Sequence, residues 1–135
     1  MKDIFYERIK QHELYIEKKE SRIDNIVNSL TKEFKSIDSR LFVKKGSRFL
    51  SNISILICID KKTISFTREL FMIKDGCKVI PAQYPYKKET NLNEIYDDVQ
   101  LGDQDNDIEL IKNMFKKYHS YGSLFKRIEN ELTKE

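Results

Sequence analysis

The sequence has no tryptophan, two cysteines, two prolines and four glycines among its 135 residues. So few glycines and prolines exclude collagen-like and low-complexity chains, and two cysteines are too few for a disulfide scaffold. The longest apolar run, residues 55–59, is far shorter than a membrane span. The first residues contain no apolar segment of the signal-peptide kind. We therefore expect a cytoplasmic protein, with no membrane partner, whose Cys58 and Cys77 stay reduced.

Hydrophobic residues are nevertheless abundant enough for a folded core. Eight Phe, seven Tyr and a hydrophobic fraction of 39% argue against disorder. The length suits one domain, so we predict a single domain over residues 1–135. Lysine, isoleucine and asparagine are frequent, whereas Ala82 is the only alanine. Because the first three have AT-rich codons, this bias indicates an AT-rich genome, such as that of a low-GC bacterium or its phage.

Isoleucine and leucine recur every seven residues over the first forty positions. This spacing predicts a helix over residues 3–45 that ends at Lys44, Lys45 and Gly46. A helix of about 40 residues would be about 60 Å long, whereas a compact domain of this size is only about 35–40 Å across. The helix must therefore break, protrude or pair with another chain.

Ser21 and Asp24 have the spacing of a capping box and favour a break in the helix near residue 21. Residues 1–20 would then be a protruding or self-associating segment. A strict seven-residue stripe suits a seam against another helix, either of the same chain or of a second copy. The residues predicted to form an oligomer interface are Ile9, Ile16, Ile23 and Leu30.

Alternating β-branched residues follow the helix and predict a three-stranded antiparallel β-meander over residues 48–82. Asp75 and Gly76 are a strong hairpin signal, and Pro81 confines the third strand to an edge or ends it. On this register Cys58 and Cys77 lie too far apart for a disulfide. Residues predicted to face the core are Phe49, Ile53, Ile55, Ile57, Ile59, Ile64, Phe66, Leu70 and Met72.

Two helices complete an α+β fold: a short helix over residues 92–100 and a long C-terminal helix over residues 107–133. Asn91 suits the N-cap of the first helix. Gly122 predicts a kink in the second.

The net charge of +3 hides a strong asymmetry along the chain. Residues 40–88 contain eleven basic and three acidic side chains, whereas residues 94–109 contain seven acidic and no basic ones. Basic residues next to tyrosines predict a surface that binds anions or nucleic acid, unless the charges are ordinary solvated ones. The candidate residues are Lys44, Lys45, Arg48, Lys61, Lys62, Tyr84, Tyr86, Lys87 and Lys88.

Asp103, Asp105 and Asp107 have the opening spacing of a calcium-binding EF-hand loop. The rest of that pattern fails, since Ile108 stands where glycine is needed and Met114 where glutamate is needed. We therefore expect a solvated loop that caps the positive end of the last helix, and no metal or other cofactor.

The two histidines, His12 and His119, have no cysteine or histidine at ligand spacing, which argues against zinc. No arrangement of nucleophile and base stands out, so we predict no catalytic residues. The favoured interpretation is a non-catalytic binding or regulatory protein that acts through protein–protein contact and forms a homodimer or larger assembly. A bacterial or phage-encoded inhibitor, antitoxin or immunity-type protein fits it. The alternatives are nucleic-acid or nucleotide binding by residues 40–88 and, more weakly, magnesium chemistry at residues 97–109.

Overall fold

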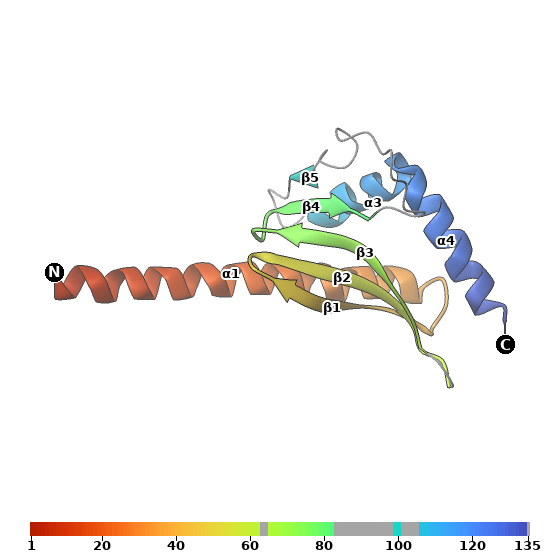
Figure 1. Ribbon diagram of the computed structural model, residues 1–135, viewed down its shortest axis with the longest axis horizontal. Coiled ribbons are helices and arrows are strands. Elements are labelled where there is room, and N and C mark those ends of the chain that lie inside the picture. The colour runs from red at the N-terminus through yellow and green to blue at the C-terminus, as the bar shows by residue number, and fades with distance from the viewer. Residues whose placement is uncertain (63–64, 83–98, 101–105, 135) are drawn as a thin grey trace.

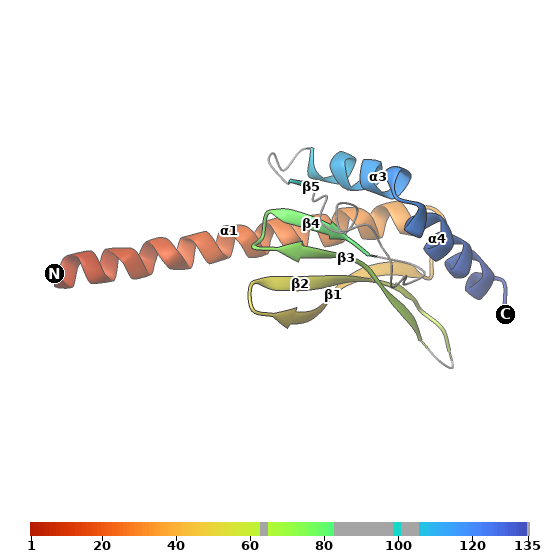
Figure 2. The same ribbon diagram turned by 45° about the horizontal axis from the view of Figure 1, so that its top comes forward.

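Helices cover one face of an antiparallel sheet, as the α+β prediction requires. The computed structural model describes residues 1–62, 65–82, 99–100 and 106–134. The strands lie in the order β1-β2-β3-β4-β5. Figures 1 and 2 show that the N-terminal helix runs along the sheet and extends far beyond it. The elements are α1 (Lys2–Lys35), β1 (Leu41–Phe49), β2 (Asn52–Ile59), β3 (Phe66–Lys74), β4 (Lys78–Pro81), β5 (Val99–Gln100), α3 (Asp107–Lys117) and α4 (His119–Leu132).

Helix α1 is continuous, and the break favoured near Ser21 does not occur. Its 34 residues give a length of about 51 Å. The helix ends at Lys35, ten residues before the predicted end. Asp38 stabilises the turn that follows, because its carboxylate accepts hydrogen bonds from the backbone N–H and the guanidinium of Arg40. These bonds hold the pKa of the Asp38 carboxyl below its usual value.

Residues 41–45, predicted as the end of the helix, are the start of strand β1. Leu41 and Val43 are buried and their neighbours are less so, which is the two-residue alternation of a strand. Gly46 is therefore no helix cap. It lies in the sheet, where an added Cβ would be 2.8 Å from Leu56 Cδ1. The seven-residue repeat of the sequence reaches Ile37, but it does not mark a buried helix face there, because Ile37 lies after the end of α1 and is 71% exposed.

The contact between α1 and β1 is polar as well as apolar. The Thr31 hydroxyl donates to the Val43 carbonyl at 3.2 Å and accepts from the Val43 N–H at 3.0 Å. On the outer side of the pair, Lys45 Nζ lies 2.7 Å from Asp24 Oδ1 and Arg48 Nη2 lies 2.7 Å from Glu20 Oε1. These bonds fix the direction of α1 relative to the sheet.

Strands β2, β3 and β4 confirm the predicted meander, and β1 and β5 extend it at its two edges. The four isoleucines of β2, at positions 53, 55, 57 and 59, are buried as predicted. Phe49 was predicted to face inward with them but lies at the end of β1 and is 74% exposed. Asp75 and Gly76 both have positive φ, as expected of the predicted hairpin turn.

A β-bulge at Leu70 changes the predicted faces of β3. Ile55 pairs with Phe71 and Leu56 pairs with Glu69, so Leu70 is the extra residue. The side chains after the bulge are shifted by one position. Phe71 and Ile73 are therefore buried in the core. The sequence alternation predicts that Met72 faces the core, but Met72 is only half-buried.

The C-terminal part of the chain differs from the prediction in two places. Val99 and Gln100 pair with Val79 and Lys78 as β5, so the predicted short helix cannot extend to residue 100. The rest of that helix lies outside the described residues. The long last helix is divided at Tyr118, whose backbone is extended, and not at Gly122, which lies within α4.

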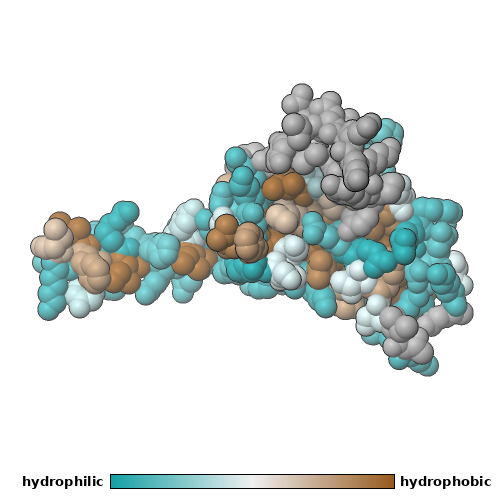
Figure 3. All heavy atoms as spheres, in the orientation of Figure 1, coloured by the Kyte–Doolittle hydropathy of each residue, from teal (hydrophilic) through white to brown (hydrophobic). Residues whose placement is uncertain are grey.

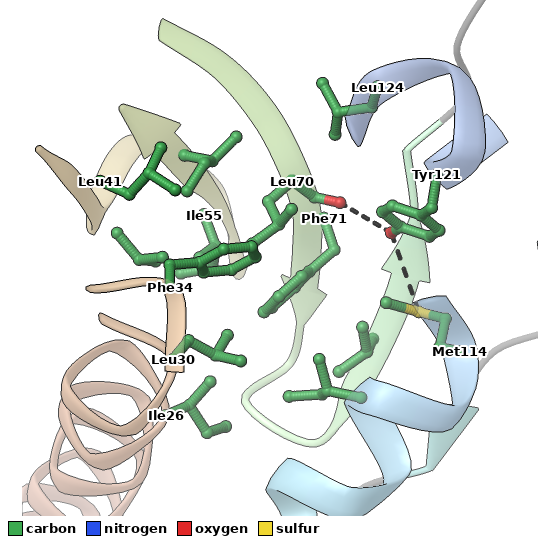
Figure 4. Close-up of a cluster of buried hydrophobic side chains, with 14 of the residues drawn as sticks. Ile26, Leu30, Phe34, Leu41, Ile55, Leu70, Phe71, Met114, Tyr121 and Leu124 are labelled. Atoms are coloured by element: carbon green, nitrogen blue, oxygen red, sulfur yellow. Dashed lines mark hydrogen bonds between the residues drawn. The ribbon is translucent and has the colours of Figure 1, made fainter. Parts of the chain in front are cut away.

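The core lies between the sheet and the helices, and Figure 4 shows part of its buried side chains, Phe34, Phe71 and Tyr121 among them. Phe115 and Phe125 pack against these and complete a cluster of aromatic rings. The rings come from α1, β3, α3 and α4 and are tilted or edge-on to one another, with the Phe115–Tyr121 centroids 4.8 Å apart. The fully buried Tyr121 donates its hydroxyl proton to the carbonyl of Leu70 at 2.7 Å and accepts from the Ala82 N–H at 3.3 Å. Tyr121 thus bridges Leu70 and Ala82, the next residues beyond the β3–β4 pairing that ends at Phe71 and Pro81, and gives both of these backbone groups a hydrogen-bond partner.

We expect Tyr121→Phe to lower the free energy of unfolding by about 1–3 kcal/mol, because it leaves a buried carbonyl and a buried N–H without a partner. Urea denaturation measures the effect. Tyr15→Phe is the matched control, since Tyr15 is 54% exposed and no change is expected there. Equal stability of both variants and the unmodified chain would show that the hydrogen bonds of Tyr121 contribute nothing.

Candidate functional site

The first half of α1 projects from the rest of the molecule (Figures 1 and 2). Residues 1–18, here called the projecting helix, are all exposed, and burial begins at Lys19 and Glu20. Eighteen residues correspond to about 27 Å of helix. Among the described residues, no helix has the length and apolar character needed to cross a membrane.

The projecting helix has an apolar face on the same side as the core. Residues seven apart in an α-helix are only about 20° apart around its axis, so Ile9 and Ile16 lie above Ile23 and Leu30. Ile23 and Leu30 are 3% and 1% exposed in the core, whereas Ile9 and Ile16 are 40% and 44% exposed. Figure 3 shows hydrophobic side chains along the projecting helix. We call Ile4, Phe5, Ile9, Tyr15 and Ile16 the apolar face.

The predicted oligomer interface is therefore divided in two. Ile23 and Leu30 pack against the sheet of their own chain, as does Ile26. Ile9 and Ile16 are left at the surface. The sequence alone does not separate the two pairs, because all four residues have the same spacing.

A second exposed apolar feature is the turn between β1 and β2. Phe49 is 74% and Leu50 84% exposed, and we call these two residues the hairpin tip. Leu50 also has a φ of 54°, a left-handed conformation that costs a non-glycine residue about 1–2 kcal/mol. The sequence prediction missed this site. Its signal was the adjacent pair Phe49–Leu50, which interrupts the alternation of a strand at a turn.

The hairpin tip lies beside the base of the projecting helix. Arg48, next to Phe49, pairs with Glu20 at 2.7 Å. The next hairpin turn also lies there, since a Cβ on Gly76 would be 2.8 Å from Lys19 Cδ. The apolar face and the hairpin tip are therefore neighbouring parts of one end of the molecule, and they are separated by charged residues.

Those predicted anion-binding residues that the structure describes do not gather in one place. Lys45 and Arg48 are paired with carboxylates of α1, and Lys61 pairs with Glu131 at 2.9 Å. Arg48 and Lys61 belong to opposite ends of the β1–β2 hairpin, roughly 26 Å apart at strand spacing. Lys44 and Lys62 are exposed. Tyr84, Tyr86, Lys87 and Lys88 lie outside the described residues, so nucleic-acid binding stays a prediction.

The candidate metal ligand Asp107 takes part in a buried ion pair. Its side chain is 2% exposed, and its two oxygens accept hydrogen bonds from Arg22 at 2.7 and 3.1 Å. This pair joins the start of α3 to α1. Asp103 and Asp105 lie outside the described residues. Within residues 1–62, 65–82, 99–100 and 106–134, no three His, Cys, Asp or Glu side chains are placed to hold a metal ion.

The remaining candidate residues are scattered. His12 lies on the projecting helix and His119 at the start of α4, and both are exposed. Cys58 is buried, Cys77 is half-buried, and neither is in a disulfide bond. These four side chains form no common site.

Lys61 and Glu131 hold α4 against the end of the β2–β3 hairpin. Their side chains are only 9% and 18% exposed. Ammonium groups of Lys134 and Lys61 hydrogen-bond to the Glu131 carboxylate and lower its pKa from 4.5 to about 2. Because the folded-state pKa is depressed, the ionised form stabilises the fold above the unfolded pKa, and this contribution is lost as the pH falls through the folded value.

We expect the stability of the unmodified chain to fall between about pH 5 and about pH 2 more steeply than that of Glu131→Gln, which lacks the titrating group. Urea midpoints measured across this range test the difference. Glu129→Gln on the same helix is the charge-matched control and should keep the steeper slope. Parallel curves for the unmodified chain and Glu131→Gln would contradict the assignment.

We expect Leu50→Gly to keep or raise the free energy of unfolding, by up to about 1 kcal/mol, because glycine adopts positive φ without strain. Leu50→Val, which is β-branched and more strained there, should lower it. Thermal and urea unfolding measure both variants. A loss of stability in Leu50→Gly would mean that the Leu50 side chain stabilises its own chain.

Comparisons of the chain with protein-family models, with curated proteins and with solved structures found no match.

Proposed function

We propose that this chain is a small, non-catalytic binding protein and that the apolar face of the projecting helix is its binding element. The observation that carries the proposal is the exposure of Ile9 and Ile16 on the side of α1 that elsewhere forms the core. Apolar side chains gathered at the surface of a protein mark interaction sites. An amphipathic helix laid into a groove or against another helix is a common mode of protein recognition.

The way the helix is held supports this role. A free helix of about 18 residues is marginally stable in water. Here it continues from a segment anchored by Ile23, Ile26 and Leu30 in the core. Its turns are therefore ordered before a partner arrives. A binding element that is already ordered loses less conformational entropy on association.

The charges of the projecting helix favour a protein partner over a polyanion. Residues 1–20 contain five basic and five acidic side chains, so the segment is neutral. Without net positive charge, it has little long-range attraction for nucleic acid. Inhibitors, antitoxins and immunity-type proteins, the roles that the sequence suggests, act through contacts of this kind. The AT-rich coding bias suits a bacterial or phage gene, as before.

The test compares substitutions on the two sides of the projecting helix. Ile9→Glu/Ile16→Glu places two charges on the apolar face, and Leu14→Glu, on the opposite side, is the matched control. We expect the tagged chain to retain a protein, either a second copy or another chain, in size-exclusion and affinity experiments. The double variant should lose at least about 90% of it, which is a tenfold weaker affinity.

Measured at a concentration at which the unmodified chain is unbound, the stability of both variants should equal that of the unmodified chain, because all three positions are exposed. Two results would overturn the proposal. One is an unmodified chain that is strictly monomeric and retains no protein. The other is a double variant that retains its partner as well as Leu14→Glu does.

A further inference from the structure

The partner of the projecting helix is, we infer, the projecting helix of a second copy of this chain, packed antiparallel. The inference rests on the proposed function and names its partner. It combines the apolar face and the hairpin tip, which neither the core nor a single copy of the chain covers. Three features of the structure support it: the side on which the body lies, the length of the projecting helix and the position of the hairpin tip.

The side of the apolar face decides between parallel and antiparallel packing. Because Ile9 and Ile16 are in line with Ile23 and Leu30, a helix packed on the apolar face lies on the sheet side of α1. In a parallel pair, each copy's sheet would occupy the space that the other copy's α1 needs. In an antiparallel pair, the two sheets lie at opposite ends and leave the shared seam open.

The length of the projecting helix matches this arrangement. If Phe5 faces Ile16 of the second copy, then Ile9 faces His12 and Met1 comes level with Glu20. Glu20 is where the body of the first copy begins, through its pair with Arg48. Each helix therefore ends where the other molecule's sheet starts, and the seam uses the whole projecting helix.

The hairpin tip then receives the end of the second helix. The start of the chain carries exposed apolar side chains among charged ones, with Met1 at 96%, Ile4 at 60% and Phe5 at 59% exposed. In the antiparallel pair they lie beside Phe49 and Leu50 of the other copy. This contact gives a reason for a leucine at a left-handed turn position that glycine would occupy without strain.

The size of the surface is sufficient for a specific dimer. Half-exposed large side chains offer about 100 Å² each, and a specific interface needs about 800 Å² per partner. Eight such side chains per copy reach that area. The neutral charge of residues 1–20 also allows two copies to meet without net repulsion. The eight side chains are Met1, Ile4, Phe5, Ile9, Tyr15, Ile16, Phe49 and Leu50.

Light scattering after size exclusion tests the dimer. We expect twice the mass of one chain for the unmodified protein and for Leu14→Glu, and the mass of one chain for Ile9→Glu/Ile16→Glu. A single-chain mass for the unmodified protein overturns the inference. If that monomer still captures a different protein through Ile9 and Ile16, the proposed function stands while this inference fails.

Directional cross-linking tests the antiparallel packing. Two versions of the chain, one with Phe5→Cys and one with Ile16→Cys, are made on a Cys77→Ser background, which removes the half-buried native thiol. With a short thiol cross-linker we expect the mixture to give cross-linked dimers and each version alone to give few. Efficient cross-linking of each version with itself, and no cross-link between the two versions in the mixture, would indicate a parallel pair and overturn the inference.

The hairpin tip gives a test in which two readouts move in different directions. We expect Leu50→Gly to weaken dimer association about tenfold, measured by dilution, while the stability of the folded monomer, measured at a concentration at which dimers are absent, stays equal or rises. A purely structural role of Leu50 would lower both. Unchanged association in this variant would remove the tip from the interface and overturn that part of the inference.

Discussion

The packing of the second half of α1 on the sheet is the contact on which the rest of the structure depends. Ile23, Ile26 and Leu30 bury one side of the helix against the strands. The pairs of Glu20 with Arg48 and Asp24 with Lys45 fix the point at which the helix leaves the sheet. Exposed pairs of this kind contribute about 0–1 kcal/mol each, so the apolar contact supplies stability and the pairs supply direction.

The same helix joins the C-terminal half of the chain to the sheet. Arg22 binds Asp107 and Glu33 binds Lys112, so α3 is held to α1 at its first residue and at its middle. The ammonium of Lys112 accordingly has a raised pKa, mainly through its hydrogen bond to Glu33. Helix α4 is held at its far end by Arg40, which donates to the Leu132 carbonyl, and by Lys61. Much of the positive charge between residues 40 and 61 therefore serves contacts within the chain.

Periodicity in the sequence predicts the elements of this fold better than their ends. The long helix, the isoleucines of β2 and the turn at Asp75 follow from repeats that packing enforces. The end of α1 and the start of β1 could not be predicted in this way. The apolar spacing of the helix extends by coincidence through Ile37 to Leu41. Only the turn at Asp38 shows that the residues after Lys35 are no longer helical. The bulge at Leu70 belongs to the pairing of β3 with β2 and has no local signal in the sequence.

The candidate site was predicted only in part, for a related reason. Spacing identifies Ile9 and Ile16 as members of a stripe but does not say which members the sheet covers. Lysine pairs indicate an anion-binding surface only if their charges are unpaired, and pairing of Lys45 and Lys61 depends on contacts between distant segments. Exposure, unlike periodicity, is a property of the whole fold.

The hydrogen bonds between Thr31 and Val43 have a consequence for how many copies can join. Strand β1 is the outermost strand on its side of the sheet, and an open strand edge invites further chains to add to it without limit. The Thr31 hydroxyl occupies both the N–H and the C=O of Val43, and the irregular pairing after Lys45 interrupts the edge further on. Growth of the sheet from molecule to molecule is thereby obstructed along this edge. The association of two identical helices that we propose would be closed by its own twofold symmetry, so it would give a finite assembly and not a fibre.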